Sequence, residues 1–294
     1  MSTSDYTFSA KDFCAPVDGS FRIAKAHSSP PKNAPDDNDC EKQLKKTVKQ
    51  LDQQQRRLYA QNKHAVLCVF QAMDAAGKDS TIRAVLGKLN PAGFQVYSFK
   101  APSPEELDHD FLWRTACRLP ERGRIGVFNR SYYEEVLVVR VHPEYIKAQR
   151  LMEPAKNRKF WEHRYESICT HEQHLTRNGT VILKFFLNVS KEEQRQRFLS
   201  RLQTPAKNWK FSAADLAERE HWKDYMHAYQ QCINATSTAS APWHIIPADN
   251  KPFMRLTVAH ILQETLTELK PEYPSLDAKQ QAELPRIVQR LTDE

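Results

Sequence analysis

The feature that most constrains the fold is an apolar run at residues 65–70, which ends in a turn of small residues closed by Gly77-Lys78. Ser80 and Thr81 follow and open a predicted helix. A strand, a tight turn and a helix N-terminus in this order can bind phosphate. Backbone N–H groups and the positive end of the helix dipole converge on the turn, and the lysine adds a mobile charge. The segment therefore predicts an α/β fold with a phosphate site and favours a phosphoryl-transfer enzyme.

The loop departs from the nucleoside-triphosphate pattern G-x-x-x-x-G-K-[ST] at two positions, since Ala72 replaces the first glycine and Asp79 follows the lysine. A strand–turn–helix without a catalytic role is therefore the alternative. Asp74 is also unusual, because a carboxylate repels phosphate unless a cation lies between them. It is either a magnesium ligand, a base that orients the attacking phosphate oxygen, or a cap that interacts with the helix dipole.

Four further apolar runs predict strands at residues 94–99, 125–128, 181–187 and 243–247. Helices are predicted over about 41–61, 78–89, 104–118, 153–177, 191–202, 213–236 and 253–269, with capping boxes at Ser103 and Ser190. Strands that alternate with helices favour one parallel sheet covered on both faces. Ligands of such sheets bind beyond the carboxyl ends of the strands, so the candidate site lies in the loops that follow them.

Three segments are expected along the chain. Residues 1–55 form an N-terminal arm and a leading helix, and the first 40 or so are predicted to be loosely ordered because prolines and aspartates are frequent there. Residues 56–270 form the core, and residues 271–294 form a C-terminal tail.

Composition limits the function classes. The 294 residues carry a formal net charge of +7, which suits either an ordinary basic surface or a polyanionic partner. No nucleic-acid-binding module is recognisable, no apolar run is long enough to span a membrane, and the N-terminus lacks signal-peptide features. Six scattered cysteines without a C-x-x-C motif indicate reduced thiols in a cytoplasmic protein, without a zinc site.

Charged residues follow the other predicted strands. After the third strand, Arg130 is a candidate phosphate clamp and Glu134 could supply the carboxylate that Asn129 lacks; a surface ion pair is the alternative. Residues 201–212 combine cations with Trp209 and Phe211, which suits a lid, although a plain connection between helices is the alternative. The residues after the second strand are candidate substrate contacts or one helix face: Lys100, Asp110, Trp113 and Arg114.

Several segments together resemble the polyphosphate kinase 2 family. They are residues 71–79 (QAMDAAGKD), 98–102 (SFKAP), 109–114 (HDFLWR), 128–134 (FNRSYYE), 184–187 (KFFL), 207–211 (KNWKF), 241–243 (APW) and 247–249 (PAD). The resemblance covers about residues 60–268. In this family, position 72 varies and glycine or aspartate follows the loop lysine, so both departures from the nucleoside-triphosphate pattern agree with it.

The resemblance implies a Mg²⁺-dependent, reversible transfer of the terminal phosphate of inorganic polyphosphate to a nucleotide, with Mn²⁺ as a substitute metal. Asn129 stands where many members have aspartate, and in this respect the chain resembles the branch that phosphorylates both AMP and ADP. GMP and GDP are further candidate acceptors. The implied fold is a P-loop kinase-like α/β/α sandwich, similar to thymidylate kinase, with a helical lid near 204–220. A homodimer or homotetramer is expected, and neither nucleic acid nor membrane is expected as a partner.

Roles for individual residues follow from the resemblance and from phosphoryl-transfer chemistry. Asp74 and Glu134 are expected to hold the metal and the acceptor phosphate, while Lys78 and Arg130 neutralise the transferring group. Phosphate and nucleotide contacts are expected at Ala75, Ala76, Gly77, Asp79, Ser80, Thr81, Arg83, Lys100, Asp110, Arg114, Asn129, Lys207, Asn208, Trp209 and Lys210. An ATP-dependent nucleotide kinase of the same fold and a non-catalytic polyanion-binding protein are the rival readings.

Overall fold

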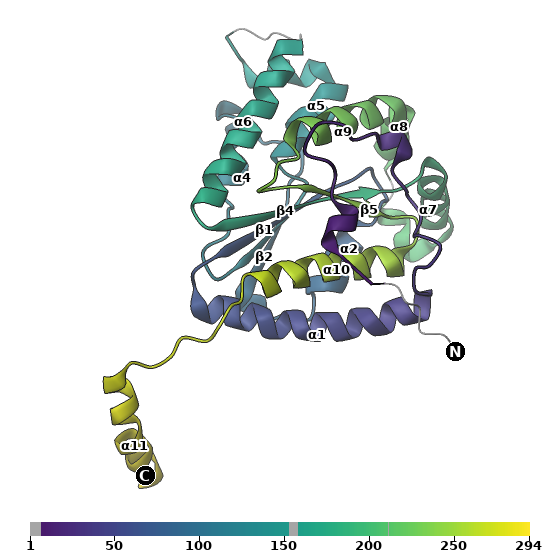
Figure 1. The fold of residues 1–294 in the computed structure, drawn as a ribbon. Coiled ribbons are helices and arrows are strands. Elements are labelled where there is room, and N and C mark those ends of the chain that lie inside the picture. The colour runs from purple at the N-terminus through teal and green to yellow at the C-terminus, as the bar shows by residue number, and fades with distance from the viewer. Residues whose placement is uncertain (1–6, 153–157, 211) are drawn as a thin grey trace.

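Five parallel strands form one sheet in the order β2-β3-β1-β4-β5 (Figure 1). The computed structural model describes residues 7–152, 158–210 and 212–294. The strands are β1 (Ala65–Gln71), β2 (Phe94–Ser98), β3 (Ile125–Asn129), β4 (Thr180–Asn188) and β5 (Trp243–Pro247). All seven residues of β1 are buried, as expected for the central strand of a sheet covered on both faces. The predicted five-stranded parallel sheet is confirmed.

Helices cover both faces of the sheet (Figure 1). One side holds α1 (Asp37–Gln61), α2 (Lys78–Leu86) and α10 (Lys251–Glu268), and α1 packs along α10. The other side holds α6 (Arg158–Arg177) and α9 (Trp222–Thr236). The remaining α-helices are α3 (Pro104–Asp108), α4 (Trp113–Ala116), α5 (Val138–Val141), α7 (Lys191–Gln203), α8 (Ala213–Glu220) and α11 (Ala278–Thr292). Short 3-10 helices are η1 (Ala10–Phe13), η2 (Ile23–Lys25), η3 (Pro91–Gly93), η4 (Tyr132–Val136), η5 (Pro143–Gln149) and η6 (Pro205–Lys210).

The helices predicted over 104–118 and 213–236 are each divided into two shorter helices, so the prediction of two continuous helices is wrong. The capping box at Ser103 is present, but α3 stops because His109 is extended and Asp110 accepts the backbone N–H of Leu112 at 2.9 Å. The predicted helix over 213–236 breaks at His221, between α8 and α9. The first residues of the helix predicted over 153–177 lie outside the described ranges.

The capping box predicted at Ser190 is only half formed. The Ser190 hydroxyl accepts the N–H of Glu193, but the Glu193 carboxylate pairs with Arg197 at 2.7 Å. Asp249 accepts the Ser190 N–H instead, at 2.7 Å. This exchange ties the start of α7 to the loop that follows β5.

The N-terminal segment is more ordered than its prolines suggest. Phe13, Ala15 and Phe21 are buried in the main core. The Ala15 N–H donates to the Trp243 carbonyl at 2.7 Å, and Cys14 forms an antiparallel bridge with His244. Because β5 is an edge strand, the segment covers its exposed backbone groups, and this pairing is what the prediction of a loose arm missed.

The C-terminal tail contains a helix that the sequence analysis did not predict. Figure 1 shows α11 apart from the sheet and its helices, at the end of an extended stretch. Its residues are all exposed. No helix among the described residues is both long and apolar enough to cross a membrane.

Candidate active site

The loops that follow β1 and β3 lie side by side at the carboxyl edge of the sheet. Their strands pair in parallel, with Phe70 opposite Asn129 and the Arg130 N–H bonded to the Phe70 carbonyl at 3.1 Å. The sheet register therefore brings the loop at 72–77 and the segment at 129–134 together, although about sixty residues separate them in the chain. This is the edge at which parallel sheets bind ligands.

The first loop has a backbone suited to phosphate. Gly77 caps α2 with φ of 111°, and a Cβ there would lie 3.1 Å from Met254 Cε and 3.4 Å from Ser80 Oγ. Ala75 has φ of 61°, an uncommon conformation for a residue with a side chain. The N-terminus of α2 begins at Lys78 and directs its positive dipole end to the loop.

Arg197 of α7 holds this loop from behind. Its guanidinium donates to the carbonyls of Ala75 at 3.1 Å and Ala76 at 2.6 Å, and also to those of Ala248 and Asp249. A trans peptide directs its C=O and N–H to opposite sides, so the N–H of Gly77 points away from Arg197. This buried arginine was not predicted from the sequence, because the spacing of Glu193 and Arg197 indicates only an ion pair on one helix face.

Four of the predicted site residues form a charged cluster: Asp74, Lys78, Arg130 and Glu134. Arg130 donates to Asp74 Oδ1 at 2.7 Å and to Glu134 Oε2 at 2.9 Å. The pKa of Arg130 is raised, first by Glu134 and also by Asp74. Arg130 has φ of 64°, so its backbone is in the left-handed region that few non-glycine residues adopt. The structure thus places two carboxylates and two cations close together, and we call these four residues the charged cluster.

Lys78 is the second cation of the charged cluster. Its Nζ donates to the Ala72 carbonyl at 2.9 Å across the loop. Burial of the ammonium group, together with the nearby Arg130, lowers the pKa of Lys78 to about 8, although Asp74 and Glu134 oppose the shift. The pKa of Lys78 in the free protein therefore lies only slightly above neutral pH.

Asp79 and Asn129 interact with each other. Asn129 Nδ2 donates to Asp79 Oδ1 at 2.5 Å and to Ser98 Oγ at 3.3 Å. These contacts join the first turn of α2 to the ends of β2 and β3. Ser80 bonds back to the Gly77 carbonyl at 3.0 Å, and Thr81 is fully buried, with no partner for its hydroxyl among the described residues.

A cavity of about 570 Å³ opens beside Arg130 and Glu134. Arg114 and Lys100 lie on its wall, and Arg114 pairs with Glu106 at 3.2 Å and bonds to the Lys100 carbonyl at 2.9 Å. Much of the lining is apolar or aromatic: Phe99, Leu107, Phe111, Val138, Val139 and Tyr145. The volume lies within the range of small-molecule sites.

Six predicted contacts are not found on the wall of this cavity: three lie elsewhere, and the side chains of the other three are not described. Arg83 is exposed on α2, and Asp110 uses its carboxylate in the turn between α3 and α4. Asn208 is exposed in η6. The side chains of Lys207, Trp209 and Lys210 lie outside what the structure describes.

The predicted lid is connected to the loop through α7. Arg219 of α8 donates to Gln194 Oε1 at 2.8 Å, and Gln194 donates to the Asp74 carbonyl at 2.9 Å. Glu218 of α8 pairs with His142 at 3.0 Å and lines a small cavity next to Asp74 and Glu134. Neither Gln194 nor Glu218 was predicted, because both act through contacts distant in sequence.

The chain is similar in sequence to known proteins over most of its length. A family model described as "Polyphosphate kinase 2 (PPK2)" matches residues 34–274. An "ADP-polyphosphate phosphotransferase" of Rhodopseudomonas palustris is 55% identical over 249 residues, which cover 84% of this chain and 86% of that protein. An "AMP/ADP-polyphosphate phosphotransferase" of Meiothermus ruber is 46% identical over 229 residues, 77% of this chain and 80% of that protein.

A solved structure is similar over nearly the whole chain. It is that of Polyphosphate Kinase 2 from Arthrobacter aurescens, with a TM-score of 0.87 and 37% sequence identity. The match covers 95% of this chain and 96% of that one. The P-loop kinase-like fold expected from the sequence is confirmed by this match.

Proposed function

The chain belongs to the polyphosphate kinase 2 family, and we propose that it transfers the terminal phosphate of inorganic polyphosphate to ADP and AMP. The observation that carries the proposal is the charged cluster at the end of the phosphate-binding loop. Both relatives described above are named for transfer between polyphosphate and an adenine nucleotide. This chain has a loop, cations and carboxylates suited to the same reaction.

The residues are suited to a reaction that depends on position and charge. The N–H of Gly77 and the start of α2 would hold phosphate oxygens, and Lys78 and Arg130 would neutralise charge as the phosphoryl group moves between donor and acceptor. Arg130 carries a planar fork that can bind two oxygens at once. In the free protein that fork binds two carboxylates, so a phosphate must compete with them for it.

The carboxylates fit a divalent metal. No group of three or more potential protein ligands is clustered among the described residues, but Mg²⁺ is usually held by one or two carboxylates together with substrate phosphates. We propose that Asp74 and Glu134 hold Mg²⁺, or Mn²⁺ in its place. When bound, the metal would act as a Lewis acid that neutralises phosphate charge.

The cavity beside the cluster is suited to the nucleotide acceptor. Its apolar wall would take the base, and Arg114 and Lys100 would lie near the phosphates. We propose AMP as well as ADP because of Asn129, with GMP and GDP as further candidate acceptors. We also propose the other phosphate contacts expected from the sequence. The protein is proposed to be a homodimer or homotetramer in the cytoplasm.

One experiment tests the proposal against its rivals. The purified protein is incubated with polyphosphate and Mg²⁺ and, in separate reactions, AMP, ADP, GMP or GDP, and nucleotide products are separated by anion-exchange chromatography. We expect ATP from ADP and ADP from AMP, with no other triphosphate added. Phosphorylation only when ATP is the donor would favour an ATP-dependent kinase, and salt-sensitive binding without turnover would favour a polyanion-binding protein.

A further inference from the structure

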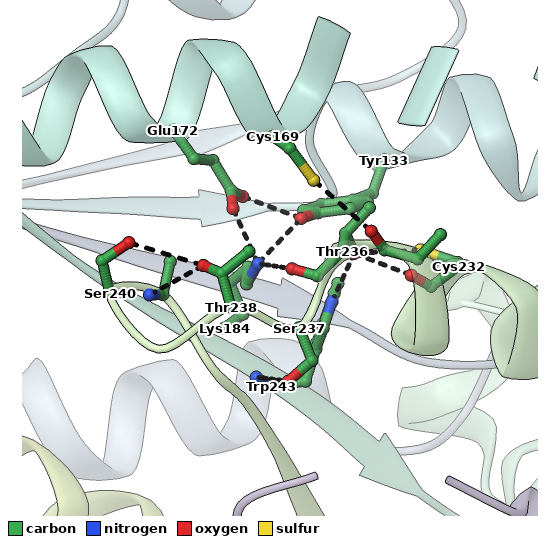
Figure 2. A network of polar contacts seen from close by, with 12 residues as sticks. Tyr133, Cys169, Glu172, Lys184, Cys232, Thr236, Ser237, Thr238, Ser240 and Trp243 are labelled. Carbon is green, nitrogen blue, oxygen red and sulfur yellow. Dashed lines mark hydrogen bonds and ion pairs between the residues drawn. The ribbon is translucent and has the colours of Figure 1, made fainter. Parts of the chain in front are cut away.

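A buried polar network includes Tyr133, the residue before Glu134 in the chain (Figure 2). At its centre, Lys184 of β4 donates to Glu172 Oε2 at 2.7 Å, to the Thr236 carbonyl at 2.7 Å and to the Tyr133 hydroxyl at 3.1 Å. The Lys184 side chain is 0% exposed and that of Glu172 is 2% exposed. All three ammonium hydrogens therefore have acceptors inside the protein.

The other carboxylate oxygen binds two tyrosines. Tyr132 and Tyr133 of η4 each donate a hydroxyl to Glu172 Oε1 at 2.8 Å. The Tyr133 ring packs against Trp243 with centroids 4.7 Å apart, and Trp243 Nε1 donates to Thr236 Oγ1 at 2.9 Å. Burial, and then the Glu172 charge, raise the pKa values of both tyrosines well above normal, so both hydroxyls stay protonated donors.

The two tyrosines belong to the segment that carries Arg130 and Glu134. On the opposite side, Ser131 Oγ accepts from Gln71 Nε2 at 3.1 Å and from the Tyr133 N–H at 3.1 Å. The segment is thus fixed at both its start and its middle, while Arg130 keeps an uncommon backbone conformation. A backbone held in the left-handed region persists only when its surroundings determine it.

We propose that Lys184 and Glu172 are positioning residues, which hold Tyr132 and Tyr133 so that Arg130 and Glu134 face the phosphate site. A buried ion pair is a weak source of stability, because apolar residues of similar volume are often as stable. The Lys184–Glu172 pair does fix the orientation of the two tyrosine side chains, because the carboxylate accepts both hydroxyls at defined positions. The proposal rests on the proposed function for its kinetic test but not for its structural one.

The structural test is amide hydrogen exchange of the full-length protein, followed on peptides that cover residues 130–136. The variants are Tyr133→Phe, which removes one hydroxyl, and the double variant Glu172→Gln/Lys184→Met, which avoids an unpaired buried charge. The control is Thr257→Val, which removes a buried hydroxyl on α10 that bonds to the Phe253 carbonyl. We expect exchange in 130–136 to be at least about tenfold faster in both network variants than in the control. Equal rates would overturn the proposal.

The kinetic test follows ATP formation from ADP and polyphosphate. We expect kcat to fall about tenfold in Tyr133→Phe and about a hundredfold in the double variant, with KM for polyphosphate changed less than about twofold. In a protein that already carries Arg130→Lys, adding Tyr133→Phe should lower kcat by less than about a further twofold, because Tyr133 acts through Arg130. Full multiplication of the two effects would contradict a positioning role. A wild-type protein without turnover would refute the proposed function alone, because the exchange test does not need activity.

Discussion

The charged cluster and the buried network both pair a cation with a carboxylate, but the two regions differ in exposure to solvent. In the charged cluster, Arg130 pairs with Asp74 and Glu134, whose side chains are 27% and 19% exposed. In the network, Lys184 pairs with Glu172, and both are almost fully buried. The first set can exchange partners with a ligand, whereas the second has every donor bound inside the protein. A single chain thus uses one type of ion pair to bind and another to hold the binding residues in place.

The largest expected effect is a loss of activity, without a loss of stability, when Lys78 of the charged cluster is replaced. Lys78→Ala should lower kcat/KM for polyphosphate about a thousandfold or more, because it removes a cation from the transition-state charge. The melting temperature should stay close to that of the wild type. Lys88→Ala, which changes an exposed lysine beyond the end of α2, is the matched control. Near-wild-type kinetics for Lys78→Ala would remove this lysine from the mechanism.

The second prediction concerns stability in the buried network. Lys184→Met alone leaves the Glu172 carboxylate buried without its cation, so the free energy of unfolding should fall by about 3–5 kcal/mol. Adding Glu172→Gln should restore part of this loss. Urea denaturation measures both, and Thr257→Val provides the control for a lost buried hydrogen bond. A loss in Lys184→Met no greater than in that control would mean that the pair is not coupled.

The third prediction addresses the carboxylates of the charged cluster. Asp74→Asn keeps the side-chain shape and the backbone carbonyl that Gln194 binds, but removes a charge. We expect kcat/KM to fall about a hundredfold and half-saturation to need at least about tenfold more Mg²⁺. Glu192→Gln, an exposed change on α7, is the control. An unchanged Mg²⁺ requirement would exclude Asp74 as a ligand.

The smallest expected effect is on pH dependence. Because the pKa of Lys78 is lowered to about 8, most of this lysine is charged at pH 7 and most is neutral at pH 9. Phosphate binds the charged form, so kcat/KM for polyphosphate should fall about fifteenfold between pH 8 and pH 9.5, with an apparent pKa near 8. Lys78→Arg stays charged and should lose this alkaline decline. A decline that persists in Lys78→Arg belongs to another group.

The fold and the loop were predictable because their signals are local. Apolar runs and a small-residue turn before Gly77-Lys78 define strands and a helix start within short windows, and the pairing of β1 with β3 then brings Arg130 to Asp74. Pairing of these two strands in a parallel sheet is thus enough to place Arg130 near the loop. The ion pair between Arg130 and Glu134 was the alternative reading of that segment, and it is present. The pairing of Arg130 with Asp74 did not follow from the sequence, since Arg130 could equally have faced solvent.

The supporting residues were not predictable. Arg197 meets the carbonyls of Ala75 and Ala76 across more than a hundred residues, and no pattern in a helix sequence specifies a backbone carbonyl elsewhere. Lys184 reads as a charge within an apolar strand, which suggests a functional contact but not its buried partner on α6. The lid contacts of Lys207, Trp209 and Lys210 stay predictions.

The most direct test of the account uses polyphosphate labelled with ³²P in its terminal phosphates. The wild-type protein is mixed with this polymer, ADP and Mg²⁺, and nucleotides are separated after less than one turnover. We predict that the label appears in ATP at the γ-position and that Lys78→Ala leaves it in the polymer. Label that stays in the polymer with the wild-type protein, while ADP is phosphorylated only after another nucleoside triphosphate is added, would contradict the account.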